Sequence, residues 1–396
     1  MNFSPQKLVH VYYHGTGTKQ LMGRLLLKDR TVFFEYDADF VKSGLELSPF
    51  KLPLKSGVVS AKEPIFEGLF GIFNDSLPDG WGRWLIDRKL LSLGLAPSHL
   101  SPLDRLCLVG THGMGALSYE PEQALGSPLF SENLEEIAYE IETTLAEDDQ
   151  YLDDLLTLSG SSAGARPKVL LRIEGVDWLI KFRASIDPID IGPIEYAYHL
   201  MAITAGMNVP EAKLFPVKNA KKGLGFFGVK RFDRHAQQRI HMHTIAGLLH
   251  ADHRTPSLDY AAIMKTTWHL THNINQCEMQ FRNAVFNVLS HNRDDHAKNF
   301  SFLMDAQGVW QVSPAYDLTF SAGPAGEHST MVMGEGKNIK RIHLLKLAEI
   351  NDINKEKALE IIEQVQHAVS LWPSIAEKVG VTRPQRHAIG KVLGRL

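Results

Sequence analysis

The densest cluster of reactive side chains in the 396-residue sequence lies at residues 291–321, HNRDDHAKNFSFLMDAQGVWQVSPAYDLTFS. Asp294 and Asn299 stand five positions apart in a short loop, and Asp317 follows beyond an expected hairpin. This order of residue types is typical of phosphoryl transfer, in which one aspartate orients the attacking hydroxyl and accepts its proton. The amide and the second carboxylate supply the hard oxygen ligands that Mg²⁺ prefers. The segment therefore indicates a phosphoryl-transfer site.

Two other interpretations of this segment stay open. Acids in such a loop also accept hydrogen bonds from backbone N–H groups, which would make residues 294–299 a capped loop without chemistry. A zinc site is the second alternative, because Asp-Asp-His resembles a ligand set, but no second His or Cys stands at metal spacing. Four further histidines lie on a different segment and are predicted to be surface and helix-packing residues: His241, His243, His250 and His253.

The segment SGSSAGARPK, residues 159–168, is a candidate phosphate-binding loop. It has small residues at nearly every position, so its backbone amides can approach phosphate oxygens. Arg166 and Lys168 at its end can neutralise negative charge. An ordinary turn is the alternative, since Gly- and Ser-rich loops are common.

Lys181 strengthens the phosphate interpretation, because it stands inside the apolar strand WLIKFR. A lysine there is unfavourable without a partner, and kinases use a strand lysine to hold the α- and β-phosphates. Such a lysine pairs with an acid on the next helix, where Glu195 is the natural partner. The alternative is an edge-strand lysine whose ammonium group reaches solvent.

The segment GVKRFDR, residues 228–234, follows as the chain leaves the expected strand region. Backbone groups around Arg231 and Phe232 could bind an adenine edge, with Asp233 near the ribose. An ordinary charged strand end is the alternative.

The elements that would position these residues read as strands first and helices later, which indicates an α+β chain. The Gly-rich segment 106–121 is interpreted as a buried turn and hairpin. Strands are predicted at 8–14, 21–27, 31–36, 168–173, 177–183, 212–217 and 226–234, with a late hairpin at 300–314. Helices are predicted at 84–94, 134–145, 193–206, 245–250, 258–271 and 278–291, and again from Ile342 onward.

Composition excludes several broad classes of protein. With 44% hydrophobic and 22% charged residues, the chain is ordinary for a soluble globular protein. A net charge of −3 disfavours a wholesale nucleic-acid binder. Cys107 and Cys277 are too few for a disulfide framework and are expected to be buried thiols. Neither a signal peptide nor an apolar run long enough to cross a membrane is visible, so we expect a cytoplasmic protein without a membrane partner.

Together these motifs resemble the HipA family of bacterial serine/threonine kinases, the toxin components of HipBA-type toxin–antitoxin pairs. The resemblance covers most of the chain, and several motifs in order are far more specific than any one of them. The segments that carry it are FNDSLPDGWG, SSAGARPK, WLIKF, VKRFDR, HMHTIAGLLHADHR, NRDDHAKNFSF and SPAYDLT.

The resemblance implies a two-lobed, protein-kinase-like α+β fold of HipA type. Its N-terminal β-rich subdomain would occupy residues 1–125. Residues 126–234 would form the kinase N-lobe with the phosphate loop and the lysine strand. Residues 235–396 would form the helical C-lobe with the catalytic loop.

The resemblance also implies individual roles. Asp294 looks like the catalytic base, and Asn299 and Asp317 look like the magnesium ligands. Lys181 looks like the phosphate-binding lysine, with Glu195 as its ion-pair partner. The implied nucleotide-binding residues are Ala163, Gly164, Ala165, Arg166, Pro167, Lys168, Lys181, Lys230, Arg231, Phe232, His296, Ala297, Lys298, Asn299, Tyr316 and Asp317.

Ser161 stands where the family has its autophosphorylated loop serine. The adjacent Ser162 replaces an apolar residue found in better-known members, so either serine could be the modified one.

The function so implied is an ATP- and Mg²⁺-dependent serine/threonine protein kinase that modifies a cytoplasmic protein. The family expectation for that target is a translation component such as an aminoacyl-tRNA synthetase. The expected partner is a small helix-turn-helix antitoxin resembling HipB, through which any DNA contact would come. Two alternatives are a non-catalytic ATP-binding co-repressor and a kinase for a lipid or small molecule.

Overall fold

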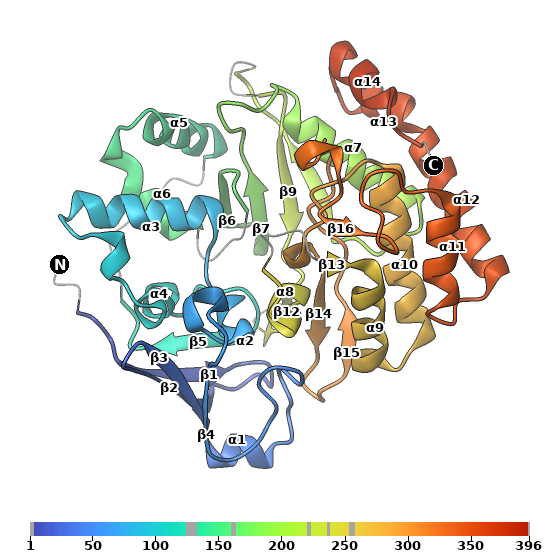
Figure 1. The fold of residues 1–396 in the computed structure, drawn as a ribbon. Coiled ribbons are helices and arrows are strands. Elements are labelled where there is room, and N and C mark those ends of the chain that lie inside the picture. Colours follow the sequence, from blue (N-terminus) through green and yellow to red (C-terminus); the bar gives the residue numbers. More distant parts are fainter. Residues whose placement is uncertain are drawn as a thin grey trace.

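The computed structural model describes residues 4–123, 133–159, 164–219, 223–235, 238–252 and 258–394. Figure 1 shows an N-terminal sheet at one end, a second sheet covered by helices beside it, and a largely helical part on the opposite side. Residues from all three parts line one central cleft. The α+β fold expected from the sequence is confirmed.

The N-terminal part is a five-stranded antiparallel sheet of order β4-β3-β2-β1-β5. Alternating apolar residues, such as Val9, Val11 and Tyr13 of β1, turn one face toward a core shared with α1, α2 and α4. The strands predicted in the first fifty residues are confirmed. The bounds are β1 Leu8–Tyr13, β2 Gln20–Lys28, β3 Thr31–Tyr36, α1 Ala38–Lys42, β4 Val58–Ser60, α2 Gly71–Asn74, α3 Gly80–Ser92, α4 Pro102–Val109 and β5 Leu117–Glu120.

The hairpin interpretation of residues 106–121 was wrong. Pro102–Val109 is helix α4, and only the end of the segment, β5, is a strand. Ser101 caps the helix by accepting a hydrogen bond from the Asp104 N–H at 3.2 Å, and Asp104 bonds back to the Ser101 N–H at 2.8 Å. This capping box, with Pro102 in the first turn, is a strong helix-start signal that the glycines farther along the chain obscured.

The middle part is an antiparallel sheet of order β6-β7-β9-β8. Helices α3, α5 and α6 pack on one face through residues such as Trp81, Ile141 and Leu155, and α7 lies on the other. The 168–173 and 177–183 hairpin and the helices at 134–145 and 193–206 are confirmed. The bounds are α5 Leu134–Leu145, α6 Leu152–Ser159, β6 Lys168–Ile173, β7 Val176–Lys181, α7 Ile191–Thr204, β8 Ala212–Phe215 and β9 Phe226–Lys230.

Because α3 shares this second core, the segment 80–92 packs with elements far beyond it in the sequence. The domain boundaries at 125 and 234 stay predictions.

The C-terminal part is built on buried helices around α10, whose Phe281, Val285 and Leu289 lie in the largest apolar core. A three-stranded sheet of order β12-β14-β15 joins it to the N-terminal part. The predicted late hairpin and helices are confirmed. The bounds are β10 Arg234–His235, β11 Gln238–Arg239, β12 His241–Thr244, α8 Ile245–Leu249, β13 Leu258–Asp259, α9 Tyr260–Thr271, α10 Ile274–Leu289, β14 Ser301–Met304, β15 Trp310–Val312, β16 Thr330–Met331, α11 Arg341–Glu349, α12 Lys355–Ser370, α13 Trp372–Lys378 and α14 Arg383–Gly390.

Strand β12 corrects the interpretation of its histidines. His241 and His243 are buried on this strand, so the prediction that they are surface or helix-packing residues was wrong. His243 is held by Asp75 at 2.6 Å and by Ser48 at 3.0 Å, both from the N-terminal part. His253 lies outside the described residues.

Both cysteines are buried free thiols, as expected. Among the described residues, none of the helices has the length and apolar character needed to cross a bilayer.

Candidate active site

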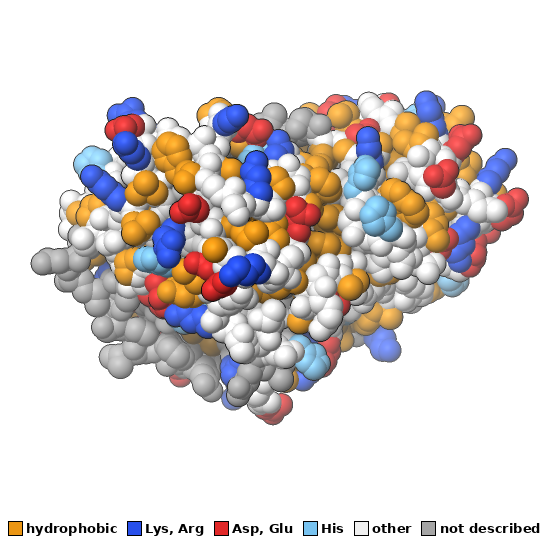
Figure 2. All heavy atoms as spheres, turned by 90° about the horizontal axis from the view of Figure 1, so that it is seen from below, with side chains coloured by type: hydrophobic (Ala, Val, Ile, Leu, Met, Phe, Trp, Pro, Cys, Tyr) orange, Lys and Arg blue, Asp and Glu red, His pale blue; other side chains and the backbone are white. Residues whose placement is uncertain are grey.

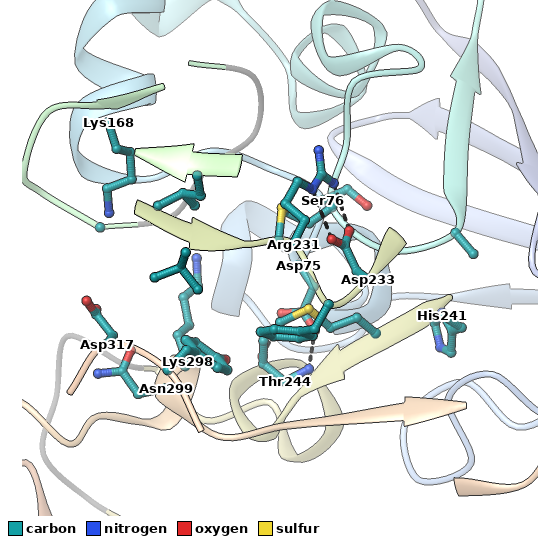
Figure 3. Close-up of a pocket in the computed structure, with 18 of the residues that line it drawn as sticks. Asp75, Ser76, Lys168, Arg231, Asp233, His241, Thr244, Lys298, Asn299 and Asp317 are labelled. Atoms are coloured by element: carbon teal, nitrogen blue, oxygen red, sulfur yellow. Dashed lines mark hydrogen bonds and ion pairs between the residues drawn. The ribbon is translucent and has the colours of Figure 1, made fainter. Parts of the chain in front are cut away.

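The central cleft brings together segments that are far apart in the sequence (Figure 3). One end holds the strand lysines and the polar loop after α10, and the other end reaches the N-terminal part. The lining residues are Ile72, Asp75, Ser76, Met114, Ala116, Leu117, Gly164, Lys168, Leu179, Lys181, Val229, Lys230, Arg231, Phe232, Asp233, His241, Met242, Thr244, His296, Lys298, Asn299, Tyr316 and Asp317.

Lys181 lies at the end of β7 with its ammonium group between two carboxylates. Its Nζ is 2.6 Å from Glu195 Oε2 and 2.5 Å from Asp317 Oδ1. Burial alone would lower the pKa of Lys181, but the charges of Asp317 and Glu195 outweigh it and raise the pKa. The ion pair expected between β7 and the following helix is formed, and the solvent-reaching edge lysine is excluded.

Glu195 is held in α7 with its side chain only 2% exposed. Its helix packs on β9 and so faces the same sheet as Lys181. A buried carboxylate at this position stabilises the ammonium group and fixes where it points.

Asp317 and Asn299 lie side by side at this end of the cleft (Figure 3). Asp317 has a left-handed φ of 57°, unusual for a non-glycine residue, which indicates that its surroundings hold it in this conformation. The ammonium group of Lys181 holds the pKa of Asp317 well below its usual range, so this carboxylate is ionised at neutral pH.

These two residues fit a magnesium ion. Asn299 donates its side-chain N–H to the Asp294 carbonyl at 2.7 Å. Its side-chain amide oxygen is therefore the atom that can bind a metal ion in the cleft. Together with the Asp317 carboxylate, that gives two hard oxygen donors, and Mg²⁺ commonly binds to one or two protein oxygens plus substrate phosphates. Among the described residues, no group of three or more His, Cys, Asp or Glu side chains is arranged to hold a metal.

Asp294 is exposed, in contrast to its neighbour Asp295. Although the residue is exposed, partial burial of its carboxyl group raises the pKa of Asp294. Asp317 and Asp295 raise it further, against the lowering effect of His296 and Arg166. Asp295 instead accepts from Tyr260 at 2.8 Å and from His328 at 2.9 Å inside the C-terminal part. Adjacent acids therefore differ in task, since Asp295 holds the loop together and Asp294 is presented to solvent.

The phosphate-loop residues are partly within the described chain, whereas Ala163, Ser161 and Ser162 lie outside it. Gly164 lines the cleft with a φ of 103° that favours glycine. Arg166 donates through Nε to both oxygens of Asp187, at 3.0 and 3.1 Å. Ala165, Arg166 and Pro167 do not line the cleft.

Lys168 begins β6 directly opposite Lys181 in the ladder, so two lysines from adjacent strands face the same end of the cleft. Burial lowers the pKa of Lys168, against the opposing charge of Asp317. The charge of Lys181 lowers the pKa of Lys168 further, so negative charge at this end of the cleft stabilises both ammonium groups.

Lys230, Arg231 and Phe232 border the middle of the cleft, where β9 ends. The guanidinium of Arg231 points back to Asp233, with contacts of 2.9 and 2.7 Å, so its backbone rather than its charge faces the cleft. Phe232 lies against Tyr316 with ring centroids 5.6 Å apart.

Asp233 lines the cleft, but protein groups already occupy its carboxylate, and its expected place near the ribose stays a prediction. Asp233 is fully buried and also accepts from Arg234 at 2.7 Å and from the Gly115 N–H at 2.8 Å. Burial would raise its pKa, but Arg231 and Arg234 lower it to about 2. Asp233 therefore joins the end of β9 to the N-terminal part.

The remaining residues that were predicted to bind nucleotide lie after Asp294 in the sequence. His296, Lys298 and Tyr316 line the cleft, and the Tyr316 hydroxyl donates to the Lys298 carbonyl at 2.5 Å. Ala297 belongs to the C-terminal core and does not line the cleft. Lys298 extends its ammonium group to Asp79 Oδ2 at 2.7 Å, a contact that the sequence did not predict.

Sequence reasoning also missed the wall contributed by the N-terminal part, including Asp75, Ser76 and Met114. Asp75 accepts from the Thr244 N–H and hydroxyl, both at 2.7 Å. The available signal was the segment FNDSLPDGWG, whose three polar residues among apolar neighbours, followed by Pro and Gly, are typical of a functional turn.

Comparison with known families matches both halves of the chain. The HipA N-terminal domain model matches residues 10–120, and the HipA-like C-terminal domain model matches residues 160–372. The second match alone covers more than half of the sequence, so the chain belongs to the HipA family.

Among curated proteins, the chain is 26% identical over 318 residues to the serine/threonine-protein kinase toxin HipA of Shewanella oneidensis, covering 73% of this chain and 70% of that protein. It is 25% identical over 202 residues to "Putative kinase Y4dM" of Sinorhizobium fredii, covering 48% of this chain and about half, 47%, of that relative.

Among solved structures, the chain superposes on a chain from the Shewanella oneidensis complex of HipA, HipB and operator DNA with a TM-score of 0.70. The identity is 19%, and the match covers 97% of this chain and 94% of that one. This likeness establishes the HipA-type fold.

Proposed function

We propose that this member of the HipA family is an ATP- and Mg²⁺-dependent serine/threonine protein kinase. The observation that carries the proposal is the buried Lys181, paired with Glu195 from α7 and with Asp317. In kinases, a strand lysine paired with a helix glutamate holds the phosphates of ATP, and a separate aspartate holds magnesium. The exposed Asp294 and the amide of Asn299 complete the set of groups that phosphoryl transfer needs.

In the proposed reaction, the hydroxyl of a serine or threonine attacks the γ-phosphorus of ATP. The new O–P bond forms as the bond to the β-phosphate oxygen breaks, and ADP leaves. Asp294 accepts the hydroxyl proton, and Lys181 neutralises the α- and β-phosphates. Asn299 and Asp317 would hold magnesium, which offsets the charge of the phosphates when bound.

The test is phosphate transfer from labelled ATP to proteins of a cell lysate by wild type and by Asp294→Asn. We expect the variant to lose about a thousandfold or more in turnover, because the acceptor of the hydroxyl proton is removed. Asp317→Asn should lose a similar factor. Glu349→Gln, an exposed change on α11, is the matched control and should keep wild-type turnover.

Wild-type turnover in Asp294→Asn would overturn the assignment. ATP binding without transfer by the wild type would favour the non-catalytic co-repressor. Label appearing in lipids or small molecules, but not in proteins, would favour the third alternative.

We further propose that the target is a cytoplasmic protein, with a translation component such as an aminoacyl-tRNA synthetase as the family expectation. The proposed partner is a small helix-turn-helix antitoxin like HipB, supported by the likeness to a chain from the HipA–HipB–operator complex. Over the described residues visible in Figure 2, Lys and Arg side chains are interspersed with Asp and Glu. With the net charge of −3, this mixture on the face shown favours DNA contact through the partner rather than through this chain.

Autophosphorylation at Ser161, or at Ser162, is proposed as the means of switching the kinase off. A phosphate adds roughly −1.5 to −2 charge and three acceptor oxygens, which would compete for the groups that bind ATP. Intact-mass analysis after incubation with Mg-ATP should show one added phosphate, absent in Asp294→Asn. An active kinase without phosphate on either serine would contradict this part of the proposal.

A further inference from the structure

The turn Asp79–Trp81 of the N-terminal part forms hydrogen bonds with both described ends of the phosphate loop. Trp81 donates its backbone N–H to the Gly164 carbonyl at 3.0 Å. Its indole Nε1 donates to Ser159 Oγ at 2.9 Å, on the other side of the loop. Asp79 Oδ1 accepts the hydrogen bond of the Gly164 N–H. Ser159 and Gly164 flank residues 160–163, which lie outside the described chain.

Gly80, between these two residues, approaches Gly164 too closely for any side chain. A Cβ atom at Gly80 would lie 2.5 Å from the Gly164 carbonyl oxygen and 2.6 Å from its carbon. Both neighbours are backbone atoms, which cannot move aside as a flexible side chain could. Its φ of 43° also favours glycine. In the sequence Asp-Gly-Trp, the glycine therefore allows the close approach to Gly164, and the two flanking residues provide the hydrogen bonds.

Asp79 also contacts the catalytic loop. Its second oxygen, Oδ2, is 2.7 Å from Lys298 Nζ, and the two side chains are 14% and 7% exposed. One carboxylate thus links the end of the phosphate loop to a lysine that follows Asp294 by four positions. Both groups that it holds, the Gly164 amide and the Lys298 ammonium, belong to residues that line the cleft.

We propose that Asp79 is a positioning residue that prepares the phosphate loop and Lys298 for the phosphates of ATP. The proposal rests on the kinase function proposed above. A phosphate loop loses conformational entropy when binding fixes its residues. Fixing its ends before ATP arrives removes part of this cost, which raises the affinity for the nucleotide. The N-terminal part would then contribute directly to ATP binding although it carries none of the reacting groups.

The experiment compares wild type, Asp79→Ala, Asp79→Glu and a matched control, Asp87→Asn, which lies on α3, the helix that Asp79 immediately precedes. ATP binding is measured by calorimetry, and turnover is measured on the same preparations. We expect Asp79→Ala to weaken ATP binding about tenfold and raise KM by a similar factor, while kcat changes by less than about threefold. Asp79→Glu should recover part of the affinity, and Asp87→Asn should match wild type.

Two further measurements separate positioning from general damage to the fold. Amide hydrogen exchange at Gly164, without nucleotide, should be at least about tenfold faster in Asp79→Ala, because its N–H loses its acceptor. In a double-mutant cycle, Asp79→Ala should weaken ATP binding less in a Lys298→Met background than in wild type, because the two side chains act through one contact.

Unchanged or tighter ATP binding in Asp79→Ala would overturn the proposal, and tighter binding would mean that the carboxylate competes with phosphate. Unchanged exchange at Gly164 would also overturn it. If the wild type binds ATP but transfers no phosphate, the kinase function fails while the positioning role stands. If the wild type does not bind ATP, both fail.

Discussion

At the scale of single residues, Lys181 shows that a buried charge, which is destabilising without partners, can indicate a functional site. An ammonium group beneath an apolar sheet is unstable alone, and here two carboxylates from separate elements surround it. Because Glu195 comes from α7 and Asp317 from the loop after β15, the three charges meet only when both lobes are in place. The cation is thus fixed by the fold rather than by its local sequence.

We expect Lys181→Met to reduce phosphate transfer about a hundredfold or more, with weaker ATP binding, because the charge opposite the phosphates is removed. Glu195→Gln should reduce it only about tenfold, since the amide can still orient the ammonium group. Rates from labelled ATP and affinities from calorimetry provide the measurement. Lys213→Met, an exposed change on β8, is the control and should transfer phosphate normally. A larger loss in Glu195→Gln than in Lys181→Met would contradict the assignment.

Much of this site could be predicted from residue types, because charged residues inside apolar segments need partners. Lys181 with Glu195 was such a case, and the pair is present. Asp79, by contrast, precedes Gly164 by 85 positions, and nothing in its own turn indicates what it contacts. Long-range contacts of this kind depend on how elements dock, which local pattern does not determine.

At the scale of elements, the end of β9 is joined to the N-terminal part by a buried charge cluster. Asp233 accepts from Arg231, Arg234 and the Gly115 N–H, and no part of it is exposed. Removing one charge from such a cluster leaves the others buried without compensation. The border of the cleft therefore depends on a carboxylate that takes no part in the proposed chemistry.

Asp233→Asn should lower the free energy of unfolding by about 3–5 kcal/mol, measured by denaturant unfolding at pH 7. The pKa of Asp233 is lowered to about 2, so its contribution is complete above the unfolded value and is lost as the pH falls toward 2. Asp39→Asn, in an exposed pair with Lys42, should leave the free energy of unfolding nearly unchanged. Equal effects of the two substitutions would show that the Asp233 cluster is not stabilising.

Element type was predictable where periodicity was strong and failed where signals conflicted. The apolar spacing of Leu134, Ile137 and Ile141 gave helix α5 correctly. Helix α4 was missed because the glycines after it suggested a hairpin, although Ser101 and Pro102 mark its start. Strand β12 was missed because four residues directly before a helix are too few to establish a period of two.

At the scale of the whole molecule, histidines join the N-terminal part to the C-terminal part. His241 Nε2 is 2.9 Å from the Leu47 carbonyl, and His243 is held by Ser48 and Asp75. His250 accepts from the Gly71 N–H at 3.0 Å. Since residues on both sides of this contact also line the cleft, the interface that holds the molecule together is continuous with the site.

This arrangement makes stability depend on pH in the range where histidine titrates. Burial lowers the pKa of His241 from its usual value of 6.5 to about 3. Between these values the unfolded chain binds a proton that the folded chain does not. The contribution of neutral His241 is therefore complete above about pH 6.5, and it falls as the pH is lowered toward 3, by roughly 1 kcal/mol per pH unit.

We expect His241→Gln, which keeps a donor for the Leu47 carbonyl, to lose less stability than wild type between pH 7 and pH 5. The glutamine amide does not titrate, so the proton uptake of the unfolded chain at this position disappears. Free energies of unfolding from denaturant titrations at pH 7, 6 and 5 provide the slopes. His367→Gln, exposed on α12, should keep the wild-type slope. If His241→Gln and His367→Gln gave the same slope, protonation of this interface would not govern the acid sensitivity of the molecule, and the remaining titrating groups would have to account for it.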